Sequence, residues 1–459
     1  MSLTVSLFTS LSALQADQGA IAVTTNNIAN VNTPGYSRQI ANLQEGPVVT
    51  FGNLQFGTGV NLASVQGVRD NVLQLRLDQQ AQTQGQLDTF VAGMNEIQPV
   101  FNEAAGAGLE SSISQFFNSF QQLAADPTNL GLRQSTISDG QALAAGFNQA
   151  ASALDTQQQA ADQGVVQSVS QINTLTAQIA SLNGQITAAT GQGQTPNSLL
   201  DQRALLVNQL SGIVDVSSIT ADKTGLTLTT KGGALLVTGT QSFNLSTQAN
   251  AAGFQDVYAQ GKDITASIQS GNLAGYLQLR DQEIPSIATK LDTLASGIAT
   301  AVNTQSTAGF DLNGAAGVNF FVPPAAGPGA ALNLAVAITN PAQVAASADG
   351  TDGNNANATA LANLQNQAVV GGQTPIDYYS SLVFQVGNDT ADATAAQTGQ
   401  QLVTQQLQDQ QGAISGVSLD QEGANLVLYQ NAYSAAARVA GIISTLFQTA
   451  INMGLVTAS

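Results

Sequence analysis

The sequence predicts a mainly helical fold with β-rich insertions, an α+β plan in which long coiled-coil-like helices from both chain ends form a rod. Apolar residues recur at helical spacing over both termini and over several internal stretches. Short β-branched segments separated by turn residues occupy only the middle of the chain. With 459 residues, 43% of them hydrophobic, the chain is long and apolar enough to bury a core.

The first apolar stripe lies at the N-terminus. Four of its members follow a seven-residue interval and two further leucines widen the face, a pattern typical of a helix packed against another helix. The stripe comprises Leu3, Leu7, Leu11, Leu14, Ile21 and Ile28.

The C-terminal segment has a matching stripe. Its apolar residues follow spacings of three and four, with neighbours that broaden the face. The packing stripe comprises Leu426, Tyr429, Tyr433, Val439, Ile443, Leu446 and Phe447.

The internal pattern predicts three kinds of domain. Heptad-like repeats from Val165 to Ile186 and from Ile284 to Ala301 indicate further long helices. From about residue 213 the helical pattern gives way to short segments with alternating or β-branched residues. A Gly- and Pro-rich stretch follows further along the chain. We therefore expect a terminal coiled-coil inner domain from 1–33 and 420–459, a helical rod domain from 34–210, 272–308 and 357–419, and β-rich outer domains at 211–271 and 309–356.

Composition excludes much chemistry. Cys, His and Trp are absent, so thiolate and imidazole nucleophiles, a Ser-His-Asp triad and the commonest zinc and haem ligands are missing. The segment from Asp349 to Asn355 resembles a calcium loop only in composition, and we interpret it as a surface turn. We expect no catalytic residue, no cofactor and no metal site.

Charge and hydropathy bear on partners. Only 9% of residues are charged, and the net charge of −18 argues against binding to nucleic acid or an anionic membrane surface. No basic, apolar signal opens the chain, and no uncharged apolar run approaches the ~18 residues of a membrane span. We therefore expect no cleaved signal and no membrane segment.

The few charges are unevenly distributed. Asp17 is the only charged residue among 1–37, and Arg438 is the only one among 423–459. An amphipathic helix at the surface of a monomer normally has a charged outer face, whereas these helices carry Ser, Thr, Gln and Asn. This pattern favours helices packed on all sides in an assembly. The alternative, a pair of ordinary core helices joining the two termini, is compatible with it.

The most specific string follows the N-terminal stripe. An Asn-rich stretch favours a helix end, and a Pro-Gly pair suits the centre of a type II turn. The aromatic ring and the guanidinium that follow are typical interface anchors, although an ordinary helix-terminating turn would look similar. The motif residues are Asn26, Asn27, Asn30, Asn32, Pro34, Gly35, Tyr36 and Arg38.

This string resembles the N-terminal motif of the flagellar axial proteins, the family of rod, hook and hook-associated proteins. The stretch from Gly416 to Leu426, with Tyr429 and Tyr433, resembles the C-terminal signature of the hook-associated members at the hook–filament junction. Shorter similarities follow in order along nearly the whole chain: Leu199–Arg203, Gly275–Leu277, Asp311–Gly314, Phe320–Phe321 and Asn340–Pro341. Ser306 departs from the pattern, since the family often has His there.

The resemblance implies a non-enzymatic structural component of the bacterial flagellum. It implies assembly at the distal end of the hook, as an adaptor that joins hook to filament in a ring or helical layer of identical copies. The implied partners are copies of itself, the hook protein, a second hook-associated junction protein, a cytoplasmic export chaperone that holds the C-terminal stripe, and the type III export apparatus. The location would be extracellular, at the hook–filament junction, after export without signal cleavage.

Three other interpretations remain open at this stage. The chain could be another axial protein, namely the hook protein or the second junction protein, but the C-terminal signature argues against both. A secreted surface adhesin with a helical stalk and a β head is the alternative from a different class, and a wall hydrolase that uses two carboxylates is more remote.

Overall fold

The computed structural model describes residues 3–51, 53–102, 108–221, 225–325 and 327–456. The chain divides into two compact units, each assembled from segments distant in sequence. The first unit comprises Met1–Gln82, Ile172–Asn244 and Gln401–Ser459, and the second comprises Thr83–Gln171 and Leu245–Gln400.

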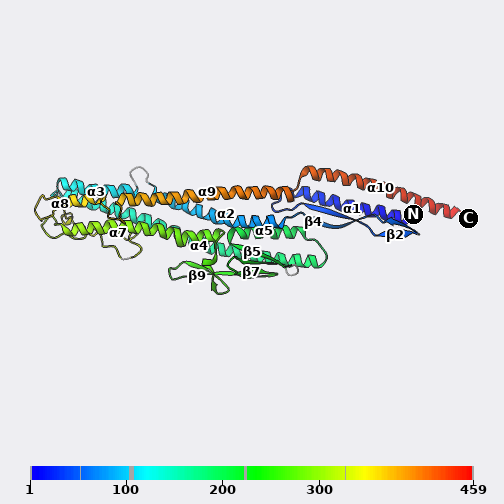
Figure 1. Ribbon diagram of the computed structural model, residues 1–459, viewed down its shortest axis with the longest axis horizontal. Coiled ribbons are helices and arrows are strands. Elements are labelled where there is room, and N and C mark those ends of the chain that lie inside the picture. The colour runs from blue at the N-terminus through cyan, green and yellow to red at the C-terminus, as the bar shows by residue number, and fades with distance from the viewer. Residues whose placement is uncertain (1–2, 52, 103–107, 222–224, 326, 457–459) are drawn as a thin grey trace. The chain divides into compact units, whose positions relative to one another are not determined.

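The terminal helices of the first unit lie side by side. Helix α1 (Leu3–Ala29) packs along helix α10 (Leu419–Val456), with the two chain ends at the same end of the pair (Figure 1). The helix α1 also contacts a small sheet, and its Gly19 lies so close that an added Cβ would sit 2.6 Å from Leu62 Cδ2. One helix is therefore held from two sides by segments that the sequence places hundreds of residues apart.

Two short hairpins follow α1. The outer strands β1 (Gln39–Glu45) and β4 (Val60–Gly67) pair antiparallel, and so do β2 (Val48–Phe51) and β3 (Leu54–Gly57). This corrects the prediction of a helical segment from residue 34 onward. The physical reason is local, because Gly46, Pro47, Gly57 and Gly59 interrupt any helix, and Gly59 has a φ of 108°.

The rest of the first unit combines helix α5 with a four-stranded sheet. Helix α5 (Asn197–Ile213) leads into an antiparallel sheet whose strand order is β5-β6-β7-β8. The start of this sheet agrees with the predicted change from helix to short β segments near residue 213. Its strands are β5 (Val216–Ala221), β6 (Gly225–Thr230), β7 (Leu235–Thr238) and β8 (Gln241–Ser242).

Three long helices contribute residues to both units. They are α2 (Asn71–Ile97), α4 (Leu130–Gly191) and α9 (Pro375–Ser415). Helix α4 contains the predicted heptad stretch from Val165 to Ile186 and extends it toward the N-terminus into one 62-residue element.

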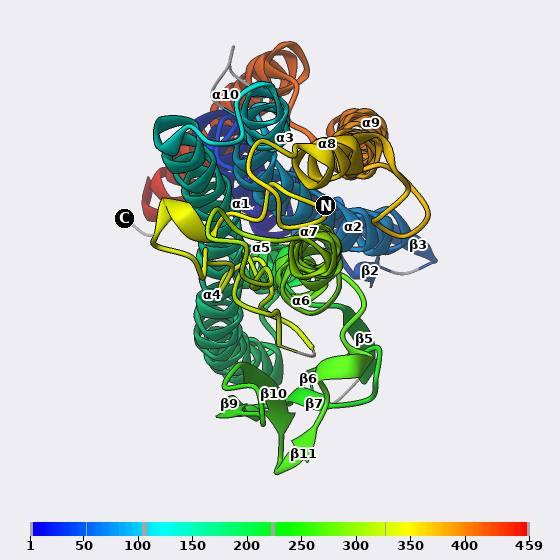
Figure 2. The same ribbon diagram turned by 90° about the vertical axis from the view of Figure 1, so that its left-hand side faces the viewer.

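The second unit is mainly helical, as the end-on view of Figure 2 shows. Its shorter helices are α3 (Leu109–Ala125), α6 (Asn272–Gln278), α7 (Ile284–Ala308) and α8 (Ala356–Asn363). A three-stranded sheet has the order β11-β10-β9, formed by β9 (Leu245–Ala249), β10 (Gln255–Ala259) and β11 (Lys262–Asp263). A π-helical turn at Leu279–Glu283 joins α6 to α7, and 3-10 turns lie at Gln98–Phe101, Thr265–Ser267, Pro341–Gln343 and Leu364–Asn366.

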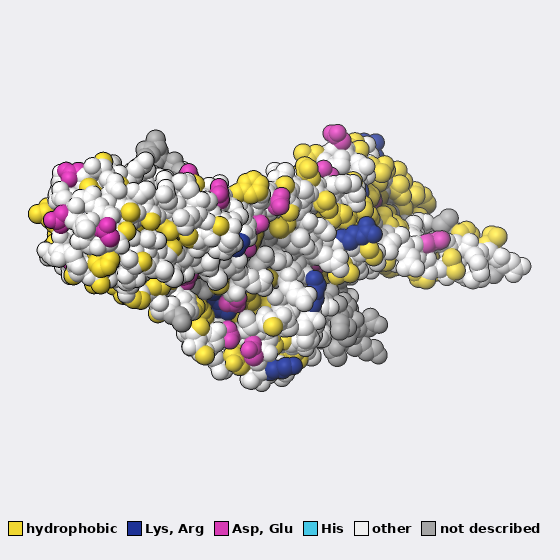
Figure 3. Space-filling model, turned by 60° about the vertical axis from the view of Figure 1, so that its left-hand side comes forward, with side chains coloured by type: hydrophobic (Ala, Val, Ile, Leu, Met, Phe, Trp, Pro, Cys, Tyr) yellow, Lys and Arg dark blue, Asp and Glu magenta, His cyan; other side chains and the backbone are white. Residues whose placement is uncertain are grey.

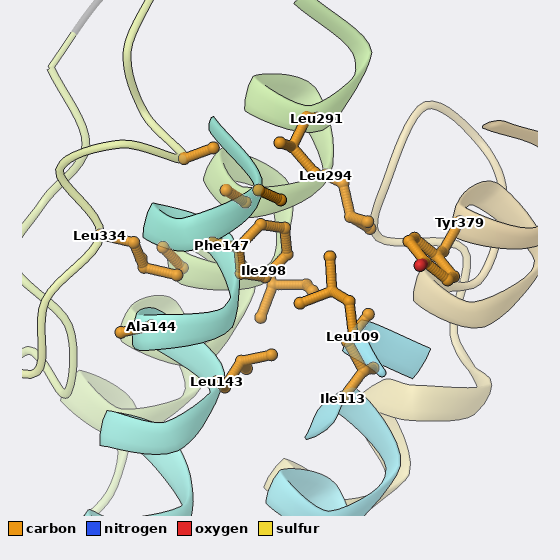
Figure 4. Close-up of a cluster of buried hydrophobic side chains, with 14 of the residues drawn as sticks. Leu109, Ile113, Leu143, Ala144, Phe147, Leu291, Leu294, Ile298, Leu334 and Tyr379 are labelled. Carbon is orange, nitrogen blue, oxygen red and sulfur yellow. The ribbon is translucent and has the colours of Figure 1, made fainter. Parts of the chain in front are cut away.

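The core of the second unit is apolar and contains many aromatic rings. Side chains from α3, α4, α7 and α9 converge in it, among them Ile113, Phe147, Ile298 and Tyr379 (Figure 4). Phe116 lies at the centre of a ring cluster whose members have centroids 5.3 to 5.4 Å from its own. The members of this core lie between Phe90 and Ala393, outside the terminal helices.

The segment predicted as β-rich at 309–356 differs from the prediction. Its described residues form isolated bridges, such as Phe321 with Val336, and no extended ladder. Side chains from α4 hold it instead, because buried Arg133 donates to the Val344 carbonyl at 2.6 Å and Asn148 donates to the Ala331 carbonyl at 2.8 Å. The segment from Asp349 forms a turn in which the Asp349 carboxylate accepts from Thr351.

The C-terminal helical stretch also bears on the membrane expectation. Within the described residues, Pro375–Met453 contains one window long and apolar enough to cross a membrane by length and composition. This window contradicts the expectation that no apolar run of the chain approaches the length of a membrane span. Only 6% of that window is buried, and one helix of this kind is weak evidence for a span.

Candidate assembly site at the helix-terminating turn

The motif string forms a tight turn directly after α1. The Tyr36 N–H donates to the Thr33 carbonyl at 3.2 Å, and Pro34 and Gly35 occupy the two central positions. Gly35, at the third position of a type II turn, has a φ of 77°. Residues with a side chain rarely adopt this positive φ, whereas glycine adopts it readily. The predicted turn is confirmed, and it reverses the chain from α1 into β1.

Asn27 is the centre of the site. Its side chain is 1% exposed. The Oδ1 atom accepts from the Tyr36 hydroxyl at 2.8 Å and from the Gln39 N–H at 2.9 Å. The Nδ2 atom donates to the Gln39 carbonyl at 2.8 Å and to Glu422 Oε2 at 3.1 Å. One buried amide therefore ties together α1, the turn, β1 and α10, with its hydrogen-bonding capacity nearly filled.

Glu422 carries the link to the C-terminal helix. It lies in the first turn of α10, is 2% exposed, and its Oε1 accepts from Arg38 Nε at 2.8 Å. The Arg38 N–H donates to the Ser415 carbonyl at 2.9 Å, at the end of α9. A carboxylate at a helix N-terminus is favourable by itself, and the ion pair adds a charge-assisted bond.

A second carboxylate joins the turn to α5. Asp201 Oδ1 accepts from the Ser37 hydroxyl at 2.7 Å and from Arg69 Nε at 2.9 Å, and its Oδ2 accepts from the Ser37 N–H at 3.2 Å. Arg69 also donates to the Asn197 carbonyl at 2.7 Å. The turn is therefore held on one side by Glu422 and on the other by Asp201.

These two carboxylates affect the tyrosine between them. Burial, together with the negative charges of Asp201 and Glu422, raises the pKa of Tyr36 to about 12. The hydroxyl therefore stays protonated and keeps its donor bond to Asn27 under ordinary conditions.

The remaining motif residues lie around this centre. Asn30 donates to Asn26 Oδ1 at 2.6 Å, and both line a groove of about 620 Å³ together with Tyr36 and the start of α5. Asn32 and Pro34 are exposed. The structure thus brings Asn27, Tyr36 and Arg38 together and places the other motif residues at the rim.

Sequence reasoning did not assign Glu422 or Asp201 to this site. Their partners lie 384 and 164 residues away along the chain, so no local pattern shows the contact. The available signal was that both acids lie inside segments that carry the family resemblance, Gly416–Leu426 and Leu199–Arg203.

The predicted packing stripes lie on the terminal helices. Of the N-terminal stripe, Leu3, Leu7, Leu14, Ile21 and Ile28 are half-buried, and Leu11 is 46% exposed.

The C-terminal stripe is divided between two faces. Ile443 is buried and Leu426, Tyr429 and Phe447 are half-buried, whereas Tyr433, Val439 and Leu446 are exposed. The division follows from helix geometry, because Leu446 lies ~100° around the helix from Phe447. Val439 and Leu446 instead share an outer face with Leu428 and Ile442, which are both 61% exposed.

The two isolated charges of the terminal helices behave differently. Asp17 is 9% exposed, and burial raises the pKa of its carboxyl. Arg438 is exposed on α10.

One face of the molecule in Figure 3 shows how few charged side chains the surface carries. Among the described residues, no group of three or more acidic side chains is placed to hold a metal ion.

Comparison with known proteins gives the family. The chain is 31% identical over 497 residues to the flagellar hook-associated protein 1 of Bacillus subtilis, and the match covers 97% of each chain. This chain belongs to the flagellar hook-associated protein 1 family. The protein of that name from Salmonella typhimurium is 28% identical, with 96% of this chain and 98% of the relative covered. That from Escherichia coli is 29% identical with the same coverage.

Family models and a solved structure agree. Residues 94–321 match the flagellar hook-associated protein FlgK helical domain, and residues 7–36 match the flagella basal body rod protein family. The flagellar hook junction protein FlgK from Burkholderia pseudomallei has the same fold, with a TM-score of 0.67 at 17% identity. It covers 74% of this chain and 100% of its own. The rod-protein match ends within the turn described above.

Proposed function

We propose that this chain is a structural subunit of the bacterial flagellum that assembles at the distal end of the hook and joins hook to filament. The observation that carries the proposal is similarity over nearly the full length to flagellar hook-associated protein 1 from three bacteria. The match covers 97–98% of each of these relatives. This coverage favours a junction role over that of the hook protein, the second junction protein or an adhesin. The proposed subunit has no enzymatic role.

The test is a deletion strain. Loss of the gene should leave hooks that form normally, carry no filament, and release filament protein into the medium. The wild-type chain supplied from a plasmid should restore filaments. Normal filaments in the deletion strain would contradict the proposal.

We further propose that α1 and α10 form an inner coiled-coil layer in which every face meets another chain. The observations in support are the two isolated charges of these helices and the outer face of α10, where Leu428, Val439, Ile442 and Leu446 are exposed. The helical remainder would form the next layer, and the sheets at 216–263 would lie further out.

A charge on the N-terminal stripe tests the inner layer. Leu14 is half-buried on α1, so Leu14→Asp should abolish filament attachment while the second unit, whose core is independent of α1, stays folded. Circular dichroism of the purified variant reports the fold. Normal swimming of this variant would contradict the packing proposed for α1.

The proposed partners are copies of this chain, the hook protein on the proximal side and a second hook-associated junction protein on the distal side. Export would proceed through the type III apparatus without signal cleavage, to an extracellular location. Before export, a cytoplasmic chaperone would cover the outer face of α10, which otherwise exposes a long apolar stripe. Co-purification of a chaperone with wild-type chain, but not with Ile442→Asp, would support this role. Equal recovery with both would refute it.

A further inference from the structure

Asp17 on α1 is an enclosed acid without a counter-charge. Its side chain is 9% exposed, and no ion pair among the described residues includes it. Burial raises the pKa of its carboxyl, and neither a hydrogen bond nor a cation lowers that pKa. The subunit by itself therefore carries an acid whose charged form is poorly solvated and unpaired.

The carboxylate of Asp17 is nevertheless accessible from outside the subunit. Asp17 shares the enclosed face of α1 with Thr24 and Asn27. Neither of its carboxylate oxygens is among the fully enclosed side-chain atoms of the described residues that lack a hydrogen-bond partner. The exposure that remains to this side chain therefore includes its charged tip, which a group from another chain can reach.

Arg438 on α10 is the matching isolated cation. It is exposed, and no ion pair among the described residues includes it. Each residue of a helix is turned ~100° from the last, so Arg438 lies ~160° around α10 from the half-buried Ala436 and Ala440. It lies within ~80° of the exposed Ile442 and Leu446, so it belongs to the outer face of α10.

The two charges of one copy do not meet. The helices α1 and α10 run antiparallel, and Asn27 contacts Glu422 at 3.1 Å. From that contact Asp17 lies ~15 Å along α1 and Arg438 lies ~24 Å along α10, at 1.5 Å per residue. They are therefore ~9 Å apart along the helix pair, and Arg438 is on the side of α10 that faces away from α1.

We propose that Asp17 of one copy forms an ion pair with Arg438 of a second copy. The inference rests on the proposed function, in which the terminal helices of neighbouring copies pack against one another. A neighbour that covers the outer face of α10 also encloses Arg438, and an enclosed cation needs a counter-charge. Asp17 and Arg438 are the only charged residues in 1–37 and 423–459, so helices packed from these segments supply only this pair.

Other acids near the terminal helices gain less from such a contact. Glu422 already accepts bonds from Arg38 and Asn27. Asp420 is exposed in the first turn of α10, where water and the helix N-terminus already stabilise its charge. Because Asp17 and Arg438 lie on different helices, the contact joins two different surfaces of identical copies. Such a contact repeats from copy to copy and generates a ring or a helical layer.

Carbodiimide cross-linking of assembled particles tests the contact. Arg438→Lys keeps the positive charge and supplies a primary amine, which a carbodiimide joins to a carboxylate in direct contact. Hook–junction particles from a strain that carries this variant should give a dimer on a denaturing gel, with position 438 linked to Asp17. The free subunit should give no such link. Arg76→Lys, at an exposed arginine of the same unit, is the control and should give no link to Asp17.

Three results would overturn the proposal. They are the absence of a link between position 438 and Asp17 in particles that carry filaments, a link within one copy, and a link of position 438 only to another acid or another protein. These results leave filament formation intact, so they separate this inference from the proposed function. Failure of the wild-type chain to restore filaments in the deletion strain would reject the function itself.

A double-mutant cycle measures the pair in strains that express one variant only. Arg438→Gln leaves Asp17 enclosed without its cation, so the amount of the chain in isolated particles should fall at least about tenfold. The double variant Asp17→Asn/Arg438→Gln removes both charges, so its amount should recover toward that of wild type. Arg76→Gln should match wild type. Effects of the two substitutions that simply add would overturn the proposal.

Asp17→Asn alone should act in opposite directions on the free subunit and on the assembly. It should stabilise the free subunit, because it removes an unpaired enclosed charge. It should lower the amount of the chain in particles, because it leaves Arg438 of the neighbouring copy unpaired. An increase in both measurements would overturn the proposal, since it would show that Asp17 has no partner in the assembly.

Discussion

Replacement of Glu422 offers the sharpest test of the polar network at the turn. Glu422 is 2% exposed and accepts bonds from Arg38 at 2.8 Å and from Asn27 at 3.1 Å. Glu422→Gln keeps the shape and one acceptor but removes the charge. A hydrogen bond to a charged group contributes ~1.5–3 kcal/mol, and we take the lower end because Arg38 is 24% exposed.

The assay is amide hydrogen exchange of residues 20–39 and of the first turns of α10. A loss of ~1.5 kcal/mol should speed exchange through local opening about tenfold in both segments. Glu422→Ala leaves the Asn27 amide and Arg38 both without this partner, so we expect ~3 kcal/mol and a larger acceleration. Asp420→Asn, an exposed acid two residues earlier, is the matched control. Exchange in Glu422→Gln equal to that in the control would refute the role assigned to the network.

Three further predictions concern single residues. Burial raises the pKa of Asp17 above its unfolded value, so its ionisation opposes folding, and the free energy of unfolding should rise as pH falls through the folded pKa toward the unfolded one. Asp17→Asn should stabilise at neutral pH and abolish that dependence in urea unfolding curves, and an unchanged pH dependence would contradict it. The pKa of Tyr36 is raised from 10.0 to about 12, so the free energy of unfolding should fall between these two values as pH rises. Ultraviolet titration should show one tyrosine that ionises at higher pH than the others and that Tyr36→Phe removes; uniform titration of all tyrosines would refute this. A Cβ at buried Gly164 would lie 2.5 Å from the Tyr276 ring, so Gly164→Ala should lower the free energy of unfolding by ~1–3 kcal/mol. The control Gly191→Ala, on the same helix with open space around it, should leave the thermal midpoint unchanged, and equal midpoints for the two variants would exclude the contact.

The parts that the sequence predicted are those with local physical causes. The terminal helices follow from apolar spacing, and the turn follows from Pro34 and Gly35. The hairpins at 39–67 were missed because their strands are short, and because the glycines that interrupt the segment were not weighed against the helical prediction. The segment at 309–356 was assigned to the β-rich outer domains, but its Gly- and Pro-rich turns leave it irregular, with isolated bridges among its described residues.

The contacts that complete the site required three dimensions. Asn27 and Glu422 meet across 395 positions of sequence, and no spacing rule connects them. The separation of the C-terminal stripe into a face against α1 and an outer face likewise depends on which side α1 occupies. The sequence therefore located the apolar stripe of α10, and the structure showed which of its residues pack against the chain and which are exposed.

The direct test of the central proposal is a cryo-electron microscopy map of the isolated hook–filament junction. We predict that α1 and α10 of each copy lie in the innermost layer, that the outer face with Leu428, Val439, Ile442 and Leu446 is covered by a neighbouring chain, and that Glu422 still contacts Asn27 and Arg38. A map in which this outer face of α10 remains open to solvent would contradict the account.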